Sequence, residues 1–195
     1  MTRGPAAMAR ELAAAIVLAL AAAGAARAAD DGDACSRLIP DSLVRAVQAS
    51  FPNFRAPLAA DNLPDDVAAN LKARGSGCLG AASADLDGDA VPDFVLGLAP
   101  LTQRTPLAVI ALARGSQWVF QPINAQVGTR ERLYVDVVPP GRYDRSEALE
   151  PPLPGSDDKR QVTCVNHGVV VGATRATGIV YCLVRGSWWR VVVSG

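Results

Sequence analysis

From Cys78 to its C-terminus, the chain consists largely of short apolar segments separated by turn residues, and this pattern constrains the fold more than any other feature. The segments are rich in β-branched and aromatic residues, which favour extended strands. Short strands that follow one another after brief turns are typical of antiparallel pairing. We therefore expect a largely antiparallel β-sheet, with strands in FVLG (94–97), LAVIALA (107–113), WVFQPI (118–123), LYVDVV (133–138), QVTCV (161–165), GVVVG (168–172), GIVYCLV (178–184) and WRVVVS (189–194).

Two turns in this series share the pattern L-x-R-G-S-x-W, at 112–118 and at 183–189. An Arg-Gly-Ser turn between two apolar runs indicates a β-hairpin. With one strand upstream of each hairpin, we expect two three-stranded meanders, whose similarity arose by duplication or by coincidence. The tryptophans after these turns are expected in the core of the sheet, and ligand stacking by Trp188 or Trp189 is the alternative. At most one of these two faces the core, because successive strand residues point to opposite faces.

The residues before this series predict helices. Asp41 or Ser42 can cap a helix over LVRAVQASF at 43–51, in which apolar residues recur on one face, and Pro52 ends it. A second helix is expected over 64–75, because a proline and two aspartates suit its start and a glycine suits its end.

The expected fold class is therefore α+β, with N-terminal helices packed on a largely antiparallel β-sheet in a single domain over residues 29–195. One long segment at 139–160 interrupts the strands. It is rich in proline and charged residues, so we expect it to form an exposed loop.

Residues 1–28 have the anatomy of a secretory signal peptide. Arg3 and Arg10 flank the start of an apolar run at 12–26, and Ala26-Arg27-Ala28 is a small-x-small cleavage pattern. The run is shorter than the roughly 20 residues that a membrane span needs. We therefore expect a periplasmic or secreted protein, with no stable membrane insertion after the signal peptide is cleaved.

The four cysteines, an even number in an exported chain, indicate two disulfides. Three pairings are possible from the sequence alone. We favour Cys35–Cys78 and Cys164–Cys182, because each of these closes a shorter loop within one half of the chain. The cysteine spacings match no zinc-binding pattern, so their expected role is to staple the fold.

The segment DLDGDAVPD at 85–93 is the clearest candidate site. It places carboxylates at positions 1, 3, 5 and 9, which are Asp85, Asp87, Asp89 and Asp93. These carboxylates repel one another without a cation, and Ca²⁺ takes six to eight oxygen ligands that acidic loops supply. The main-chain carbonyl of Val91, at position 7, would provide a further ligand. The alternative is an acidic turn that binds no ion.

This loop and the strand after it, DLDGDAVPDFVLGLAP at 85–100, resemble the calcium loop of the FG-GAP (VCBS-type) repeats found in integrin α-chain propellers. The resemblance implies a structural Ca²⁺ that is held by the four aspartates and the Val91 carbonyl. The usual glycine at position 6 is Ala90, and alanine in a left-handed conformation costs on the order of 1 kcal/mol. A single copy cannot build a propeller of at least four blades. An EF-hand is excluded, because position 12 is Leu96 rather than glutamate.

The balance of 19 basic and 19 acidic residues argues against a nucleic-acid-binding protein. No G-x-S-x-G elbow, phosphate-binding loop or dinucleotide fingerprint is present, so we assign no catalytic residue. The expected function is that of a small, exported, calcium-stabilised bacterial protein that binds an unknown extracytoplasmic protein. One alternative is a structural envelope component. The other is a secreted hydrolase that uses loop carboxylates or His167, and its candidate carboxylates are Glu131, Asp136, Asp144, Glu147 and Glu150.

Overall fold

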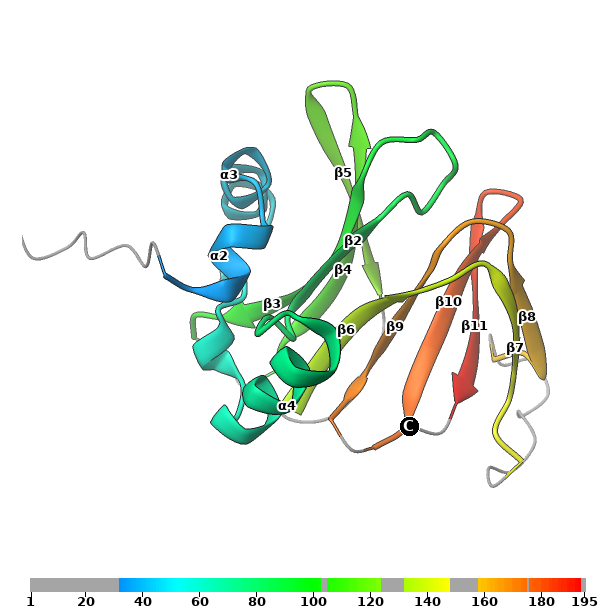
Figure 1. The fold of residues 1–195 in the computed structure, drawn as a ribbon. Helices are drawn as coiled ribbons and strands as arrows, with labels where there is room; N and C mark the ends of the chain where they lie inside the picture. The colour runs from blue at the N-terminus through cyan, green and yellow to red at the C-terminus, as the bar shows by residue number, and fades with distance from the viewer. Residues whose placement is uncertain (1–31, 103–104, 124–131, 148–157, 175, 194–195) are drawn as a thin grey trace, which may run out of the picture. The chain divides into compact units, whose positions relative to one another are not determined.

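The computed structural model begins with a group of helices, and Figure 1 shows the first two of them beside the first β-sheet. No helix among the described residues is long and apolar enough to cross a bilayer. The predicted signal peptide lies outside the described residues, which run from 32 onward without 103–104, 124–131, 148–157, 175 and 194–195. The described helices are α2 (Ala34–Leu38), α3 (Asp41–Ser50), the 3₁₀-helix η1 (Ala59–Asp61) and α4 (Pro64–Arg74).

The first sheet contains the first predicted meander, in which β3, β4 and β5 pair consecutively and antiparallel. Two short strands complete the sheet. The first of them, β1, pairs with the C-terminal end of β3, and β2 pairs with its N-terminal half. The strands are β1 (Phe54–Arg55), β2 (Ala81–Ala84), β3 (Asp93–Pro100), β4 (Leu107–Arg114) and β5 (Gln117–Ile123).

The second sheet contains the second predicted meander, β9-β10-β11, and adds β6 beside β9. All of its pairings are antiparallel. Beyond the strand pairing, the N–H of Val135 in β6 donates a hydrogen bond of 2.9 Å to the carbonyl of Leu79, which precedes β2. The strands are β6 (Leu133–Val138), β9 (Gly168–Ala173), β10 (Gly178–Val184) and β11 (Ser187–Val193).

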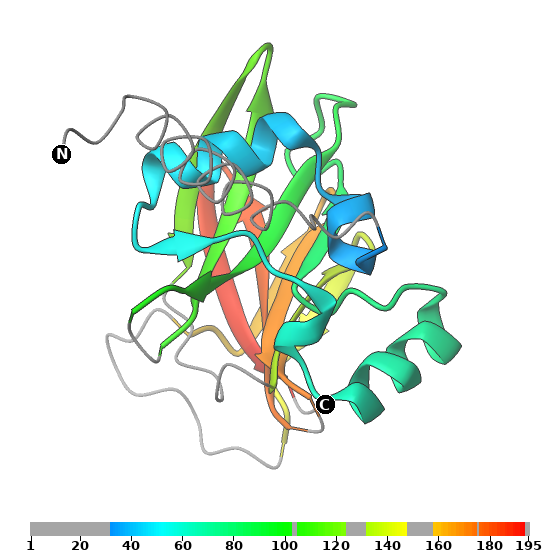
Figure 2. The ribbon, with the colours of Figure 1, turned by 90° about the vertical axis from the view of Figure 1, so that its left-hand side faces the viewer.

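The hydrophobic core lies on both faces of the first sheet. On one face, Leu96 packs in a cluster with Leu43 and Val47 of α3. On the other face, Val95 packs in a cluster with Val171 and other residues of the second sheet. Because both faces of β3 are covered, the strand is buried throughout and reads as a continuous apolar run. Figure 2 shows α3 in front of the green strands of the first sheet.

A third, two-stranded sheet covers the other face of the second sheet. It pairs β7 (Gly141–Asp144) with β8 (Gln161–Cys164). Tyr143 packs there against a cluster that contains Val180 and Val191. The prediction of one exposed loop over 139–160 is therefore wrong for β7, because pairing with a distant strand and packing against the second sheet order these residues. The middle of that segment lies outside the described residues.

The prediction of a β-rich, largely antiparallel fold that is not a propeller is confirmed, but the strands form three sheets rather than one. Packing of helices on the sheet holds for α3 and fails for α4. In α4, Leu71 is 55% exposed and the only buried residue is Asp66. Both helices occupy nearly their predicted ranges, and α4 is capped at its C-terminus by Gly75, which has a left-handed conformation. The expected cap is wrong, because α3 begins at Asp41 and its cap position is Pro40.

The two L-x-R-G-S-x-W segments form different hairpin turns. The first turn consists of Gly115-Ser116, and Gly115 has a positive φ of 58°, as the first central residue of a type II′ turn does. The second consists of Arg185-Gly186, whose φ angles are both positive, at 52° and 79°, as in a type I′ turn. Relative to the shared sequence pattern, the positions of the two hairpin turns therefore differ by one residue.

This difference in register decides where the tryptophans lie. Trp118 pairs with Ala113 and packs edge-on against Phe94, with ring centroids 5.8 Å apart, on the helix side of the first sheet. Trp188 packs against the core between the two large sheets, whereas the side chain of Trp189 is 44% exposed. The expectation that at most one of these two successive residues faces the core is confirmed.

Both disulfides of the structure join the pairs that the sequence favours. Cys35–Cys78 ties α2 to the residues before β2, and Cys164–Cys182 ties β8 to β10. All four cysteines are buried. Two buried disulfides indicate an extracytoplasmic location, because reducing compartments keep thiols free.

Candidate functional site

The predicted calcium segment forms the loop between β2 and β3, which we call the acidic loop (residues 85–92). The loop folds around the Asp85 carboxylate, which accepts hydrogen bonds from the backbone N–H of Gly88 at 2.6 Å and of Ala90 at 3.0 Å. Desolvation raises the pKa of Asp85, but the hydrogen bonds from these and neighbouring backbone amides together lower it by more, so the pKa lies below its usual value. The carboxylate therefore stays ionised.

Three of the predicted ligands come together in this loop. One carboxylate oxygen from each of Asp85, Asp87 and Asp89 lies within 4.8 Å of the other two. Oxygens around a Ca²⁺ lie about 2.3–2.6 Å from the ion, so two opposite ligands are about 4.6–5.2 Å apart. The three carboxylates are therefore spaced so that they could hold a metal ion. Ligation by the Val91 carbonyl stays a prediction.

Arg114 at the end of β4 partly neutralises these acids. Its guanidinium donates hydrogen bonds to the carboxylates of Asp87 and, at 3.3 Å, Asp89. The hydrogen bond to Asp87 is the main reason that the pKa of Arg114 is raised. A bound metal would compete with this side chain for the same oxygens. The sequence pattern does not reveal this contact, because it depends on the pairing of β3 with β4.

Asp93, the fourth predicted carboxylate ligand, does not join the group. Its side chain is fully buried, and its two oxygens accept hydrogen bonds from the backbone N–H of Ala113 at 2.8 Å and of Leu86 at 3.0 Å. Desolvation, together with the negative charges of Asp87 and Asp89, raises the pKa of Asp93 above its usual value although the two hydrogen bonds lower it. Asp93 therefore anchors the acidic loop to β4 by hydrogen bonds, and its ligation of a metal ion stays a prediction.

Ala90 has a φ of 65°, which lies in the left-handed region that favours glycine. Relief of this strain is worth about 1–2 kcal/mol, and the extra chain entropy of glycine offsets part of it. We expect Ala90→Gly to raise the free energy of unfolding by about 0.5–1 kcal/mol, measured by urea denaturation without metal. Ala84→Gly, in β2, is the control and should destabilise; a loss of stability in Ala90→Gly would contradict the strain.

The residues of the alternative hydrolase do not converge in the described part of the chain. His167 lies half-buried in the turn between β8 and β9 and makes no hydrogen bond or ion pair among the described residues. Asp136 is paired with Arg74, and Asp144 is paired with Arg142. Of the other candidates, Glu147 is exposed, and Glu131 and Glu150 lie outside the described residues.

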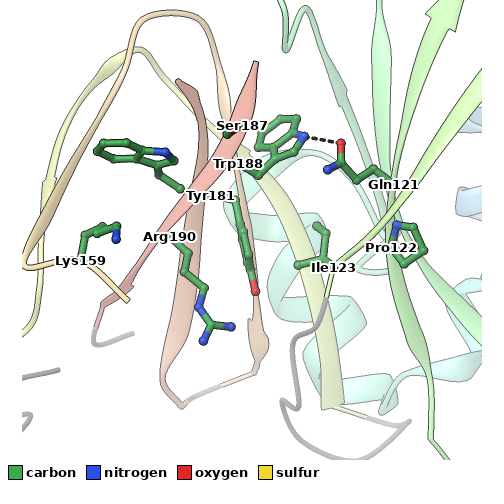
Figure 3. A pocket seen from close by; sticks show the side chains of 9 residues that line it. Gln121, Pro122, Ile123, Lys159, Tyr181, Ser187, Trp188 and Arg190 are labelled. Carbon is green, nitrogen blue, oxygen red and sulfur yellow. Dashed lines mark hydrogen bonds between the residues drawn. The ribbon is translucent and has the colours of Figure 1, made fainter. Parts of the chain in front are cut away.

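A cleft of about 390 Å³ lies between β5 and β11, and we call it the Trp188 cleft (Figure 3). At its upper end, the indole N–H of Trp188 donates a hydrogen bond of 2.8 Å to the side-chain oxygen of Gln121. The Lys159 ammonium lies over the Trp189 ring, 5.5 Å from its centroid. The residues that line the cleft are Gln121, Pro122, Ile123, Lys159, Tyr181, Ser187, Trp188, Trp189 and Arg190.

Buried polar groups lie in the wall of this cleft. Tyr181 is only 5% exposed, and its hydroxyl interacts with the Arg190 side chain, while no described group accepts its proton in a hydrogen bond. Figure 3 shows this hydroxyl and the Arg190 guanidinium directed to the same part of the cleft. Arg190 also forms an ion pair of 2.6 Å with Asp158. The two tryptophans are visible in the sequence as candidates, but only folding brings Tyr181, Arg190 and Lys159 beside them.

The tyrosines give a pH-dependent readout of burial. Desolvation raises the pKa of Tyr134, Tyr143 and Tyr181 above the ordinary value of 10.0. A raised folded-state pKa contributes stability below pH 10, which is lost as the pH rises through the folded-state pKa. We expect tyrosinate absorbance to appear only above pH 10, together with falling stability. Titration in denaturant should restore ordinary values, and a midpoint at or below 10 in the folded chain would contradict the burial.

A second groove, of about 550 Å³, lies between α4 and the second sheet. Its surface is mostly apolar, and Gly172 and Gly178 face each other in it as paired residues of β9 and β10. The buried Tyr181 hydroxyl does not line this groove. The Trp188 cleft is therefore the better-defined candidate binding site.

Comparisons with protein-family models, curated proteins and solved structures find no match to this chain. Fold and sites together define a small, β-rich protein with two disulfides, a candidate metal-binding loop and a separate cleft that combines aromatic and cationic side chains.

Proposed function

We propose that this chain is an exported binding protein of the bacterial periplasm or exterior, stabilised by a structural Ca²⁺ in its acidic loop and without catalytic activity. The observation that carries the calcium assignment is the group formed by Asp85, Asp87 and Asp89, with ligand oxygens within 4.8 Å of one another. The resemblance of the loop to FG-GAP repeats supports the choice of Ca²⁺, since hard oxygen ligands suit this ion.

Export and binding rest on separate observations. The signal-like residues 1–28 and the two disulfides support a location outside the cytoplasm. The Trp188 cleft supports binding, because concave sites with aromatic walls and a few polar groups are where ligands are usually held. Catalysis finds no such support, since the paired acids Asp136 and Asp144 are held by arginines of their own.

Calcium binding is tested by thermal unfolding in a chelator and in millimolar Ca²⁺. Free Ca²⁺ at 100 times its dissociation constant adds about 2.7 kcal/mol of stability, so the unfolding temperature should rise. The double variant Asp87→Asn/Asp89→Asn should lose this rise, because two of the three carboxylates are neutralised. An unchanged unfolding temperature of the natural chain at millimolar Ca²⁺ would refute the calcium assignment.

Arg114 supplies a sharper version of the same experiment. Arg114→Gln removes the guanidinium that competes for Asp87 and Asp89, so Ca²⁺ should bind more tightly and the calcium-dependent shift should grow. Arg142→Gln is the matched control, because it removes an arginine paired with a carboxylate outside the acidic loop. Equal shifts in both variants would show that Ca²⁺ binds elsewhere.

Partner binding is tested by affinity capture from a periplasmic extract in Ca²⁺, followed by identification of the retained proteins. A specific partner should be retained by the oxidised chain and lost when both disulfides are reduced. Repeated capture of no protein above the reduced control would contradict the binding function and leave the calcium result unaffected.

A further inference from the structure

The Trp188 cleft lies beside open backbone edges of two strands. Among the described strands, β5 has a partner only on its β4 side, and β11 only on its β10 side. The outer edge of β11 is partly covered, since the Lys159 N–H donates to the Arg190 carbonyl at 2.9 Å and the Ser146 N–H to the Val192 carbonyl at 3.2 Å. Arg190 forms a parallel bridge with Asp158 on this edge. No described residue pairs with 187–189 there, so within the described part of the chain these residues are available to an added strand.

The strand β5 is the poorer edge for such pairing. It carries Pro122 within the cleft, and proline has no N–H to donate to an added strand. An extended segment in the cleft would therefore pair its backbone with 187–189 of β11 and contact β5 through side chains. The apolar side chain of Ile123 lies on that wall (Figure 3).

The buried hydroxyl of Tyr181 calls for a hydrogen-bond acceptor. Burial raises the pKa of Tyr181, so the hydroxyl keeps its proton at neutral pH and can donate it. Its neighbour Arg190 carries only donors in its side chain, so it cannot accept that proton. A buried donor without an acceptor costs about 1–3 kcal/mol, and a ligand oxygen would remove that cost.

The charge of the cleft selects the kind of acceptor. The described residues of its lining include two cationic side chains, Lys159 and Arg190, and no carboxylate. Asp158, just outside the lining, pairs with Arg190, which leaves one positive charge in excess. An anionic oxygen satisfies both the hydroxyl donor and this charge, and carboxylates accept stronger hydrogen bonds than neutral groups do.

We infer that the Trp188 cleft binds an extended segment of a partner protein through an aspartate or glutamate side chain. The segment's backbone pairs with β11 at 187–189, and its carboxylate accepts the Tyr181 hydroxyl proton in a hydrogen bond beside Arg190 and Lys159. This inference rests on the proposed binding function and specifies the chemistry of the partner.

The test is selection from a displayed pool of random hexapeptides by the purified, calcium-loaded chain. Bound peptides should be enriched in aspartate or glutamate at one position. Tyr181→Phe removes only the buried hydroxyl and should lower the enrichment about tenfold, which corresponds to one hydrogen bond to a charged group. Its unfolding temperature should stay close to that of the natural chain, because the lost hydroxyl has no acceptor for its proton in the free protein and gives up only its interaction with Arg190.

Lys159→Gln should also lower the enrichment, and Lys72→Gln, the same change of charge on α4 outside the cleft, should leave it unchanged. Equal losses in the two lysine variants would overturn the inference, because binding would then follow overall charge. Full enrichment in Tyr181→Phe would also overturn it, because the hydroxyl would then make no hydrogen bond to the bound carboxylate. Failure to select acidic peptides would overturn it as well. The proposed function is tested separately, by the calcium-dependent unfolding and by the capture of a partner from extract, so its failure would be seen in those two experiments.

Discussion

Asp93→Ala is expected to lower the free energy of unfolding by about 4 kcal/mol, because it leaves two buried amides without an acceptor at about 1–3 kcal/mol each, apart from losses in packing. These amides belong to Leu86, which is fully buried, and Ala113 in β4. Asp93→Asn keeps one acceptor oxygen and should lose about half as much. Urea denaturation of the three chains measures both effects.

The same variants separate an anchor from a metal ligand. If Asp93 acts only as an anchor, its replacement costs as much stability in a chelator as in saturating Ca²⁺. If Asp93 also ligates the ion, the cost is larger with Ca²⁺ present. Asp87→Ala is the contrasting variant, since its cost should appear mainly with Ca²⁺. A cost for Asp93→Ala that appears only with Ca²⁺ would refute the anchoring role.

Joint replacement of Cys35 and Cys78 by alanine is expected to cost about 4 kcal/mol of stability. The disulfide spans 43 residues of sequence, and its loss frees that loop in the unfolded chain. It also frees α2, whose Cys35 packs in the same core cluster as Leu43 and Leu96. Denaturant unfolding under oxidising conditions measures the loss.

The second disulfide supplies the matched control. Cys164 and Cys182 are 18 residues apart, so their joint replacement by alanine should cost less, about 3 kcal/mol. Both double variants keep one disulfide and contain no free thiol. A larger loss for the 18-residue pair would show that native packing around Cys164 and Cys182, rather than loop entropy, sets the contribution.

Local sequence patterns are sufficient for much of this fold. The strands of both meanders lie close to the predicted segments, and Gly75 caps the end of α4, because alternation, turn residues and helix ends depend on near neighbours. The same locality explains the failures. The strand β7 depends on pairing with β8 about 20 residues later, and the burial of α4 depends on which sheet face is available to it.

The candidate metal site could be predicted only in part. The spacing of the aspartates places Asp85, Asp87 and Asp89 together, because they share one short loop. The spacing cannot distinguish Asp93 from the other three aspartates. The Asp93 carboxylate accepts hydrogen bonds from the backbone N–H groups of Leu86 and of Ala113, and Ala113 is 20 residues away in sequence. Nor does the spacing reveal Arg114, which reaches Asp87 from the neighbouring strand.

The sequence by itself determined the antiparallel strands and the acidic loop. Tertiary structure alone decided that the strands divide between sheets and that two matching turns differ by one residue in register. It also decided that a cleft forms where Gln121 and Trp188, 67 residues apart, meet through a hydrogen bond. The physical reason is that strands and turns form from neighbours along the chain, whereas pairing between sheets and the burial of polar groups depend on residues that only folding brings together.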